Sequence, residues 1–234
     1  LKPMKKLKNN TVAFSVISKY PFSGDSKTRL AKDVGLESAG RLSECFLKDF
    51  LRRFEKNQVK ESFVQTSLWI TPYRKETQDY FKNLLSNTNV SFKIVEQPDI
   101  TFFAKLAYIG ESAYKEGLNW LFLTGSDIPD FPFEIFKDVS FKSNTVYIGP
   151  DIDNGFYFIA LETKYFDLLN LKIENEETVL DSLVKRCQAG GIKVNVLKEW
   201  SDIDTIEDLK VTLSRNCPYE LPHTYELTQN LFNG

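Results

Sequence analysis

Apolar strand-like segments and amphipathic helix-like segments alternate along most of this chain, and this rhythm limits the folds open to it. Buried strands are predicted at 12–18, 63–70, 90–95, 120–124 and 192–197, with a strand pair at 145–148 and 156–161 around a turn at Gly155. Helices are predicted at 36–55, 74–85, 101–116, 176–189 and 205–213. The alternation predicts an α/β fold of three layers, α/β/α, in which helices cover both faces of a mostly parallel sheet.

The length of 234 residues suits one domain of this kind and is short for two. We predict a single domain over 11–214. The basic, polar start at 1–10 is expected to be a flexible lead-in without the apolar core of a secretory signal. The stretch 215–234, which contains Pro218 and Pro222, is expected to be an irregular tail.

Composition excludes several classes of function. The net charge of -2 offers no overall field for nucleic acid, and no apolar run approaches the roughly 20 residues of a membrane span. Three widely spaced cysteines predict neither a disulfide framework nor a zinc cluster and favour the cytoplasm. The one histidine, His223, lies in the tail, which argues against histidine triads and histidine metal clusters.

The predicted strand at 120–124 ends abruptly in Gly125, Ser126 and Asp127. A strand of an open α/β sheet that stops at a carboxylate delivers that group to the crevice where ligands bind. Asp127 and Asp130 could together hold Mg²⁺, which takes few protein oxygens. Alternatively, Asp130 caps a short helix near 132–137, while Ser126 and Asp127 only shape the turn.

The loop after the first strand places Lys27, Thr28 and Arg29 in one turn. Clustered cations and backbone N–H groups there suit a phosphate, although a solvated basic loop is the simpler reading. The loop is not a Walker A motif, because Pro21 and Ser26 stand where glycine is needed, and no G-x-G-x-x-G fingerprint is present.

Two later segments add carboxylates. The segment 149–157 carries Asp151, Asp153 and Asn154 at the tip of the predicted strand pair, where Asn-Gly is also ordinary hairpin chemistry. In the segment 200–209, an extended backbone would put Asp202 and Asp204 on one face, which suits a cation. Asp204, or the threonine after it, could instead cap the last predicted helix.

In this order, the four segments resemble a family of bacterial proteins with a glycosyltransferase A-type, or nucleotide-diphospho-sugar transferase, fold. The resemblance covers about 12–213. The family's Ala-Pro-x-Pro-Gly-x-x-Lys-Thr-Arg-Leu loop is similar to 20–30 here, and its Gly-Ser-Asp-x-Pro-Asp motif to 125–130. Its Gly-Pro-x-x-Asp-Gly-Gly-Tyr-Tyr segment is similar to 149–157, and its Asp-x-Asp-Thr-x-Glu-Asp-Leu is kept in full from Asp202.

The resemblance implies a Mg²⁺-dependent (or Mn²⁺-dependent) transferase that binds a nucleotide-sugar or a nucleoside triphosphate and a small-molecule acceptor. The expected nucleotide-binding residues are Lys27, Thr28, Arg29 and Ser126, of which Lys27 and Arg29 are also expected to be catalytic. The expected metal ligands are Asp127, itself counted as catalytic, and Asp204, with Asp202 as the alternative. The expected acceptor-binding residues are Asp153, Asn154, Gly155 and Tyr157.

Glycosyl transfer is the leading reaction, and nucleotidyl transfer with release of pyrophosphate is the alternative. Two departures also favour a third hypothesis, an inactive nucleotide-binding protein. The family's Gly-Asp-Leu-Gly-Glu-Arg-like segment is replaced by 99–105, and a Trp-Ser-Thr-like segment is replaced around 175–178.

Overall fold

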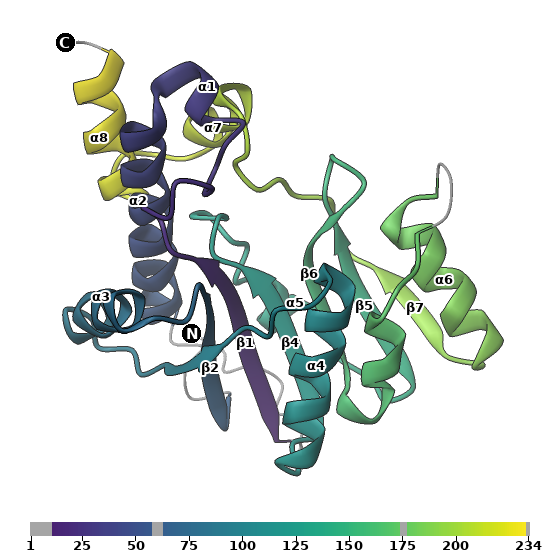
Figure 1. The fold of residues 1–234 in the computed structure, drawn as a ribbon. Helices are drawn as coiled ribbons and strands as arrows, with labels where there is room; N and C mark the ends of the chain where they lie inside the picture. Colours follow the sequence, from purple (N-terminus) through teal and green to yellow (C-terminus); the bar gives the residue numbers. More distant parts are fainter. Residues whose placement is uncertain (1–10, 58–62, 174–176, 233–234) are drawn as a thin grey trace.

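The computed structural model describes residues 11–57, 63–173 and 177–232, and its centre is a seven-stranded sheet (Figure 1). The strand order is β3-β2-β1-β4-β6-β5-β7. The strands are β1 (Val12–Lys19), β2 (Gln65–Thr71), β3 (Lys93–Glu96), β4 (Trp120–Gly125), β5 (Thr145–Pro150), β6 (Phe156–Glu162) and β7 (Lys193–Val196). The predicted α/β fold with a mostly parallel sheet is confirmed, while the lead-in predicted at 1–10 lies outside the described residues.

β6 is the strand that breaks the parallel pattern. It pairs antiparallel with both β4 and β5, whereas β1 pairs parallel with β2 and β4, β2 with β3, and β5 with β7. The predicted strand pair around Gly155 is therefore a hairpin inserted between β4 and β7. Its tip lies at the carboxyl end of β5, which is the same sheet edge as the carboxyl ends of β1 and β4.

Helices cover both faces of the sheet, as predicted. They are α1 (Ala31–Val34), α2 (Leu36–Lys56), α3 (Lys75–Ser86), α4 (Phe102–Lys115), α5 (Ile135–Asp138), the 3₁₀ helix η2 (Thr163–Leu169), α6 (Val179–Ala189), α7 (Ile206–Arg215) and α8 (Pro222–Phe232). Alternate residues of a strand face opposite sides. Phe14 belongs to the apolar cluster that includes side chains of α2, α3 and α5, while Ala13 belongs to the one that includes side chains of α4, η2 and α6. None of the described helices is long and apolar enough to cross a membrane.

The tail predicted to be irregular contains the helix α8, so that prediction was wrong. Pro222 is the first residue of the helix, where the missing N–H of proline carries no penalty. The buried carboxylate of Asp49 on α2 accepts hydrogen bonds from the backbone N–H groups of His223 and Thr224, at 3.2 and 2.9 Å. This anchor lies far away in sequence, and α8 therefore packs along α2 (Figure 1).

A third apolar cluster lies outside the two sheet faces. It joins Leu30, from the loop after β1, to Ile203, from the segment before α7, through side chains of α2, α7 and α8. Leu30 and Ile203 are both fully buried. Leu30 directly follows Arg29, and Ile203 lies between Asp202 and Asp204. The cluster therefore holds the loop and the acidic segment against each other.

Candidate functional site

Three of the predicted segments meet where β1 and β4 end. The backbone N–H of Ser126 donates to Ile17 O at 3.0 Å, and the N–H of Ile203 donates to Asp127 O at 3.2 Å. These bonds fix the residues after β4 between the end of β1 and the segment before α7. The carboxyl edge of the sheet thus carries the predicted site, as open α/β sheets favour.

Gly125 allows the side chain of Asp127 to turn back over the end of β4. A Cβ atom at residue 125 would lie 2.5 Å from Asp127 Oδ1, closer than real contacts allow. A larger residue at position 125 would therefore clash with the Asp127 carboxylate in its present position, which explains why glycine precedes it in the motif.

Lys27 connects two of the carboxylates. Its Nζ atom lies 2.7 Å from Asp127 Oδ2 and 2.7 Å from Asp204 Oδ1. Its side chain is only 7% exposed, and its backbone adopts φ +51°, a left-handed conformation that is uncommon for a residue with a side chain. Such strain persists where the surrounding contacts determine it, and it clusters at functional sites.

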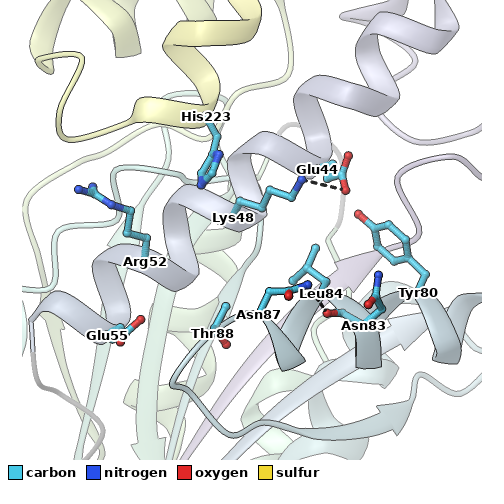
Figure 2. Close-up of a pocket in the computed structure, with 10 residues that line it drawn as sticks. All are labelled: Glu44, Lys48, Arg52, Glu55, Tyr80, Asn83, Leu84, Asn87, Thr88 and His223. Atoms are coloured by element: carbon cyan, nitrogen blue, oxygen red, sulfur yellow. Dashed lines mark hydrogen bonds and ion pairs between the residues drawn. The ribbon is translucent and has the colours of Figure 1, made fainter.

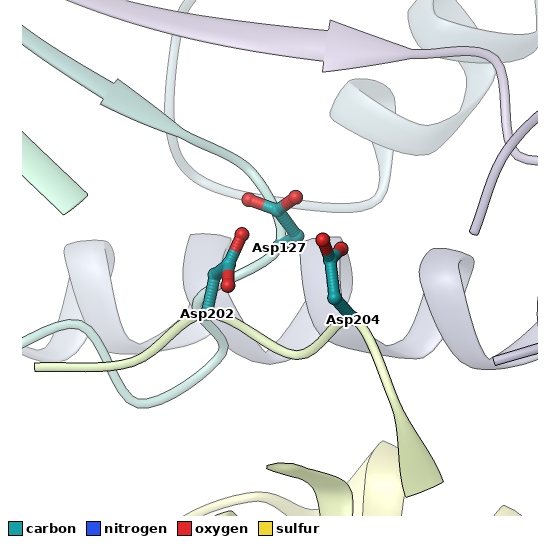
Figure 3. Close-up of side chains that lie close together, drawn as sticks. All are labelled: Asp127, Asp202 and Asp204. Atoms are coloured by element: carbon teal, nitrogen blue, oxygen red, sulfur yellow. The ribbon is translucent and has the colours of Figure 1, made fainter. Parts of the chain in front are cut away.

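Asp202 completes an acidic cluster with Asp127 and Asp204. One carboxylate oxygen from each lies within 4.8 Å of the others, and Figure 3 shows the three side chains pointing toward one another. Ile203 between them is fully buried on the opposite side. The expectation that an extended backbone puts Asp202 and Asp204 on one face is confirmed.

The electrostatics of the cluster separate its members. Burial raises the pKa of Asp202 to about 8, and the charge of Asp127 adds to the rise. Burial also acts to raise the pKa of Asp204, but Lys27 and Arg29 lower it below its ordinary value. Burial disfavours the charged form of Lys27, yet Asp127 and Asp204 outweigh that effect and raise its pKa. Without a further cation, the cluster therefore favours the uncharged form of Asp202.

The cluster fits a hard divalent cation. Its donors are carboxylate oxygens, the ligands that Mg²⁺ and Mn²⁺ prefer, and few of them are needed when phosphates and water complete the shell. Three carboxylates also outnumber the two cationic side chains beside them, Lys27 and Arg29. Added positive charge would favour the charged form of Asp202.

Arg29 links the cluster to the β5–β6 hairpin. Its guanidinium nitrogens lie 2.6 Å from Asp204 Oδ2 and 3.1 Å from Asp153 Oδ2. Asn154, next in the turn, has φ +64°, a conformation that asparagine tolerates. The side chain of Arg29 is 56% exposed, so it can still reach a ligand.

The other predicted residues fall into two groups. Thr28 is exposed beside Lys27, and Gly155 is part of the hairpin tip. Ser126 donates its hydroxyl to Ser18 Oγ at 3.0 Å, which keeps it at the sheet edge. Tyr157 is different, because its side chain packs in the core at 2% exposure instead of facing an acceptor.

Asp130 has a role that neither sequence reading anticipated. Its carboxylate, 1% exposed, accepts from Arg215 Nε at 2.6 Å and Nη2 at 3.1 Å, from Asn216 Nδ2 at 2.7 Å and from Trp200 Nε1 at 3.2 Å. All its bonding capacity is used within the protein. Asp130 therefore neither joins the acidic cluster nor caps α5, whose N-cap is Glu134.

Asp151 is a site neighbour that sequence reasoning named but did not assign. Burial raises its pKa, and the nearby charges of Asp153, Asp204 and Asp127 raise it further. The charges of the acidic cluster therefore affect the ionisation of Asp151. Its spacing of two from Asp153 was a weak signal, because the same letters also make a good hairpin turn.

A pocket of about 330 Å³ lies between α2 and α3, and none of the three clustered aspartates lines it (Figure 2). The exposed His223 reaches it from the start of α8. The lining residues are Glu44, Lys48, Arg52, Glu55, Tyr80, Asn83, Leu84, Asn87, Thr88 and His223. The charges there are largely engaged, as in the Lys48–Glu44 pair at 3.2 Å.

Solved structures define the class of fold. A protein from Desulfovibrio desulfuricans G20, provisionally assigned as a nucleotide-diphospho-sugar transferase, is similar with a TM-score of 0.79 and 24% identity, over 94% of this chain and 95% of that one. A 4-diphosphocytidyl-2C-methyl-D-erythritol synthase from Anaerococcus prevotii is similar with a TM-score of 0.56 and 13% identity, over 88% and 98%. A cytidylyltransferase from Leptospira borgpetersenii has the same TM-score of 0.56, with 12% identity over 94% of each chain. The predicted nucleotide-diphospho-sugar transferase-like fold is confirmed.

Sequence comparison adds little to this picture. No protein-family model matches the chain. A curated protein from Coxiella burnetii, provisionally assigned as ribosomal RNA small subunit methyltransferase B, is 23% identical over 197 residues. Those residues are 84% of this chain but 40% of that protein, so the chain spans about two fifths of its length.

Proposed function

We propose that this protein is a divalent-metal-dependent transferase that acts on a nucleotide-sugar, releasing a nucleoside diphosphate. The observation that supports it most is the cluster of Asp127, Asp202 and Asp204 with Lys27 and Arg29 at the carboxyl edge of this fold. Carboxylates and cations together match a ligand that carries phosphates and a metal ion.

The proposed roles follow from position and charge. Asp127 and Asp204, with Asp202, would hold Mg²⁺ or Mn²⁺, which would stabilise the negative charge on the leaving phosphate. Arg29 and Lys27 supply positive charge to the phosphates. Thr28 and Ser126 would contribute hydroxyl groups at the same edge.

The acceptor is proposed to lie against the hairpin tip, at Asp153, Asn154 and Gly155. In this reaction an acceptor oxygen forms a bond to the anomeric carbon, and the bond from that carbon to the phosphate oxygen breaks. The electron pair leaves with the nucleoside diphosphate. The Asp153 side chain is 56% exposed and lies 3.1 Å from Arg29, so it could accept the proton that the acceptor loses.

Nucleotidyl transfer is the second candidate, because two similar folds belong to a cytidylyltransferase and a diphosphocytidyl-methylerythritol synthase. There an acceptor phosphate oxygen attacks the α-phosphorus of a triphosphate, and pyrophosphate leaves. The same cations and carboxylates suit either leaving group.

The products separate the candidates. Purified protein with MgCl₂ or MnCl₂ is incubated with panels of nucleotide-sugars and nucleoside triphosphates plus acceptors, and nucleoside diphosphate and pyrophosphate are quantified. Asp127→Asn is the inactive control, and Glu207→Gln, on an exposed residue of α7, is the matched control. Product above the Asp127→Asn level and equal in Glu207→Gln supports a transferase.

The inactive nucleotide-binding protein is the remaining outcome. It would show a thermal shift with a nucleotide and metal but no product, in keeping with the altered segment at 99–105. The absence of both product and thermal shift would refute nucleotide recognition. The three free cysteines support a reducing compartment, and we propose the cytoplasm.

A further inference from the structure

Lys27 occupies the space that a bound cation would take. Its ammonium lies 2.7 Å from one oxygen of Asp127 and 2.7 Å from one oxygen of Asp204, with its side chain 7% exposed. These are two of the three carboxylates that could hold a metal ion. The folded chain therefore already supplies one positive charge at the centre of the cluster.

The ammonium and a metal ion are mutually exclusive in this position. Mg²⁺ binds oxygen at roughly 2.0–2.1 Å, so an ion on the same two oxygens would lie within about 4 Å of Nζ even on their opposite side. A dication and an ammonium so close together, in a partly buried site, repel strongly. An ion on these two oxygens therefore requires Lys27 to leave.

The neighbouring residues permit that exchange. Arg29 keeps its contacts with Asp204 and Asp153 when Lys27 moves, so the loop remains attached to the site. Asp202 makes no ion pair in the described part of the chain and is the carboxylate with room for a new partner. A lysine on a flexible four-carbon stem can change partners without moving its backbone.

We propose that Lys27 is a resident cation that fills the acidic cluster in the metal-free protein and is displaced when a divalent ion binds. Its new partner is a phosphate that arrives with the ion, a part of the inference that rests on the proposed function. Metal and nucleotide then bind cooperatively, because once either ligand has moved Lys27, the other binds without the free energy needed to move it. By thermodynamic reciprocity, the two ligands strengthen each other by the same factor.

Differential lysine labelling tests displacement in the wild-type protein. Amines are acetylated briefly with an N-hydroxysuccinimide ester, in EDTA or in MnCl₂ without nucleotide, and the peptides are quantified by mass spectrometry. Lys19, with a side chain 42% exposed beside Asp25, is the internal control. Mn²⁺ is expected to raise labelling of Lys27 several-fold and leave Lys19 unchanged. Equal labelling of Lys27 in both conditions overturns the proposal.

A variant tests competition directly. Lys27→Met removes the resident charge, and Lys19→Met removes a surface charge before the same loop. Isothermal titration with MnCl₂, again without nucleotide, is expected to show binding to Lys27→Met tighter than to Lys19→Met by about tenfold or more. Binding that is equal, weaker or absent in Lys27→Met overturns the proposal.

The two proposals fail in different experiments. Labelling and Mn²⁺ titration contain no nucleotide, so they can support displacement even when no transfer product forms. Conversely, product formation with unchanged Lys27 labelling would preserve the transferase and remove the exchange.

Discussion

Asp130 offers a sharp test of the division between structural and functional carboxylates at this edge of the sheet. Asp130→Asn keeps the size of the side chain but removes its charge and replaces one acceptor oxygen with an NH₂ group. That group would face the donors of Arg215, Asn216 or Trp200, which now converge on both oxygens. At least one donor pair would then oppose each other in a site only 1% exposed.

The magnitude follows from burial and the partners that survive. Removing one member of a buried ion pair costs about 3–5 kcal/mol. Arg215 is 26% exposed and also donates to Ser201 Oγ at 3.0 Å, so part of its charge stays solvated and bonded. We therefore expect a loss of about 2–4 kcal/mol. For a protein of this size, that lowers the Tm by roughly 5–15 °C.

Urea denaturation followed by tryptophan fluorescence measures the free energy of unfolding, and differential scanning calorimetry measures the Tm. Glu207→Gln is the matched control, because its pair with Lys210 spans 3.9 Å with both side chains at least 70% exposed. Exposed pairs contribute about 0–1 kcal/mol, so the control should change little.

Two results would refute this reasoning. The first is a loss in Asp130→Asn no larger than in Glu207→Gln, which would mean that the buried network contributes nothing. The second is the loss of Mn²⁺ binding in Asp130→Asn below its melting temperature, while Asp127→Asn retains binding. That outcome would make Asp130, and not Asp127, the metal ligand.

Three further predictions concern single residues. The pKa of Asp202 is about 8 in the folded protein but roughly 3.9 when exposed, so this group makes the metal-free protein less stable as pH rises from about 4 to about 8. In EDTA, the Tm of Asp202→Asn minus the Tm of the wild type should therefore increase as pH rises through that range. Parallel pH profiles of the two Tm values would contradict this. Asp49→Ala removes the acceptor at the start of α8 and should cost about 1–3 kcal/mol. It should also speed chymotryptic cleavage at Tyr225 in α8, and unchanged cleavage would show that the anchor is dispensable. Gly149→Ala places a Cβ atom 2.3 Å from the Tyr157 ring and should lower the Tm. Gly155→Ala, whose Cβ atom has no contact under 3.9 Å, should not lower it. Equal Tm values for the two variants would argue against tight packing of Gly149 on Tyr157.

The sequence could predict elements whose signal is local. The strand runs and amphipathic helices were found because burial repeats every two or every 3.6 residues within a short window. The pairing of Asp202 with Asp204 was predictable for the same reason, since a period of two fixes which residues share a face. Their approach to Asp127 was expected from the family resemblance, which grouped these carboxylates as metal ligands, and not from the local pattern.

What the sequence could not predict depends on partners far along the chain. Asp130 could not be distinguished from a metal ligand, because Arg215 lies 85 residues away. Lys27 was expected on phosphates, and its bonds to Asp127 and Asp204 cross 100 and 177 residues. The helix α8 was missed because Pro218 and Pro222 suggested a break, while the anchor of the helix is on α2.

The reversed strand β6 has a consequence for how this site can diversify. The hairpin tip at 151–155 connects β5 and β6, which pair with each other, and β6 also pairs with β4. Residues can be exchanged or inserted there without moving β4 or the carboxylate that follows it. In the proposed reaction, the acceptor contacts and the phosphate contacts would thus lie on separate parts of the sheet edge, joined by the ion pair of Arg29 and Asp153. If the hairpin tip contacts the acceptor as proposed, grafting other tips would change acceptor specificity and leave the proposed phosphate site unchanged.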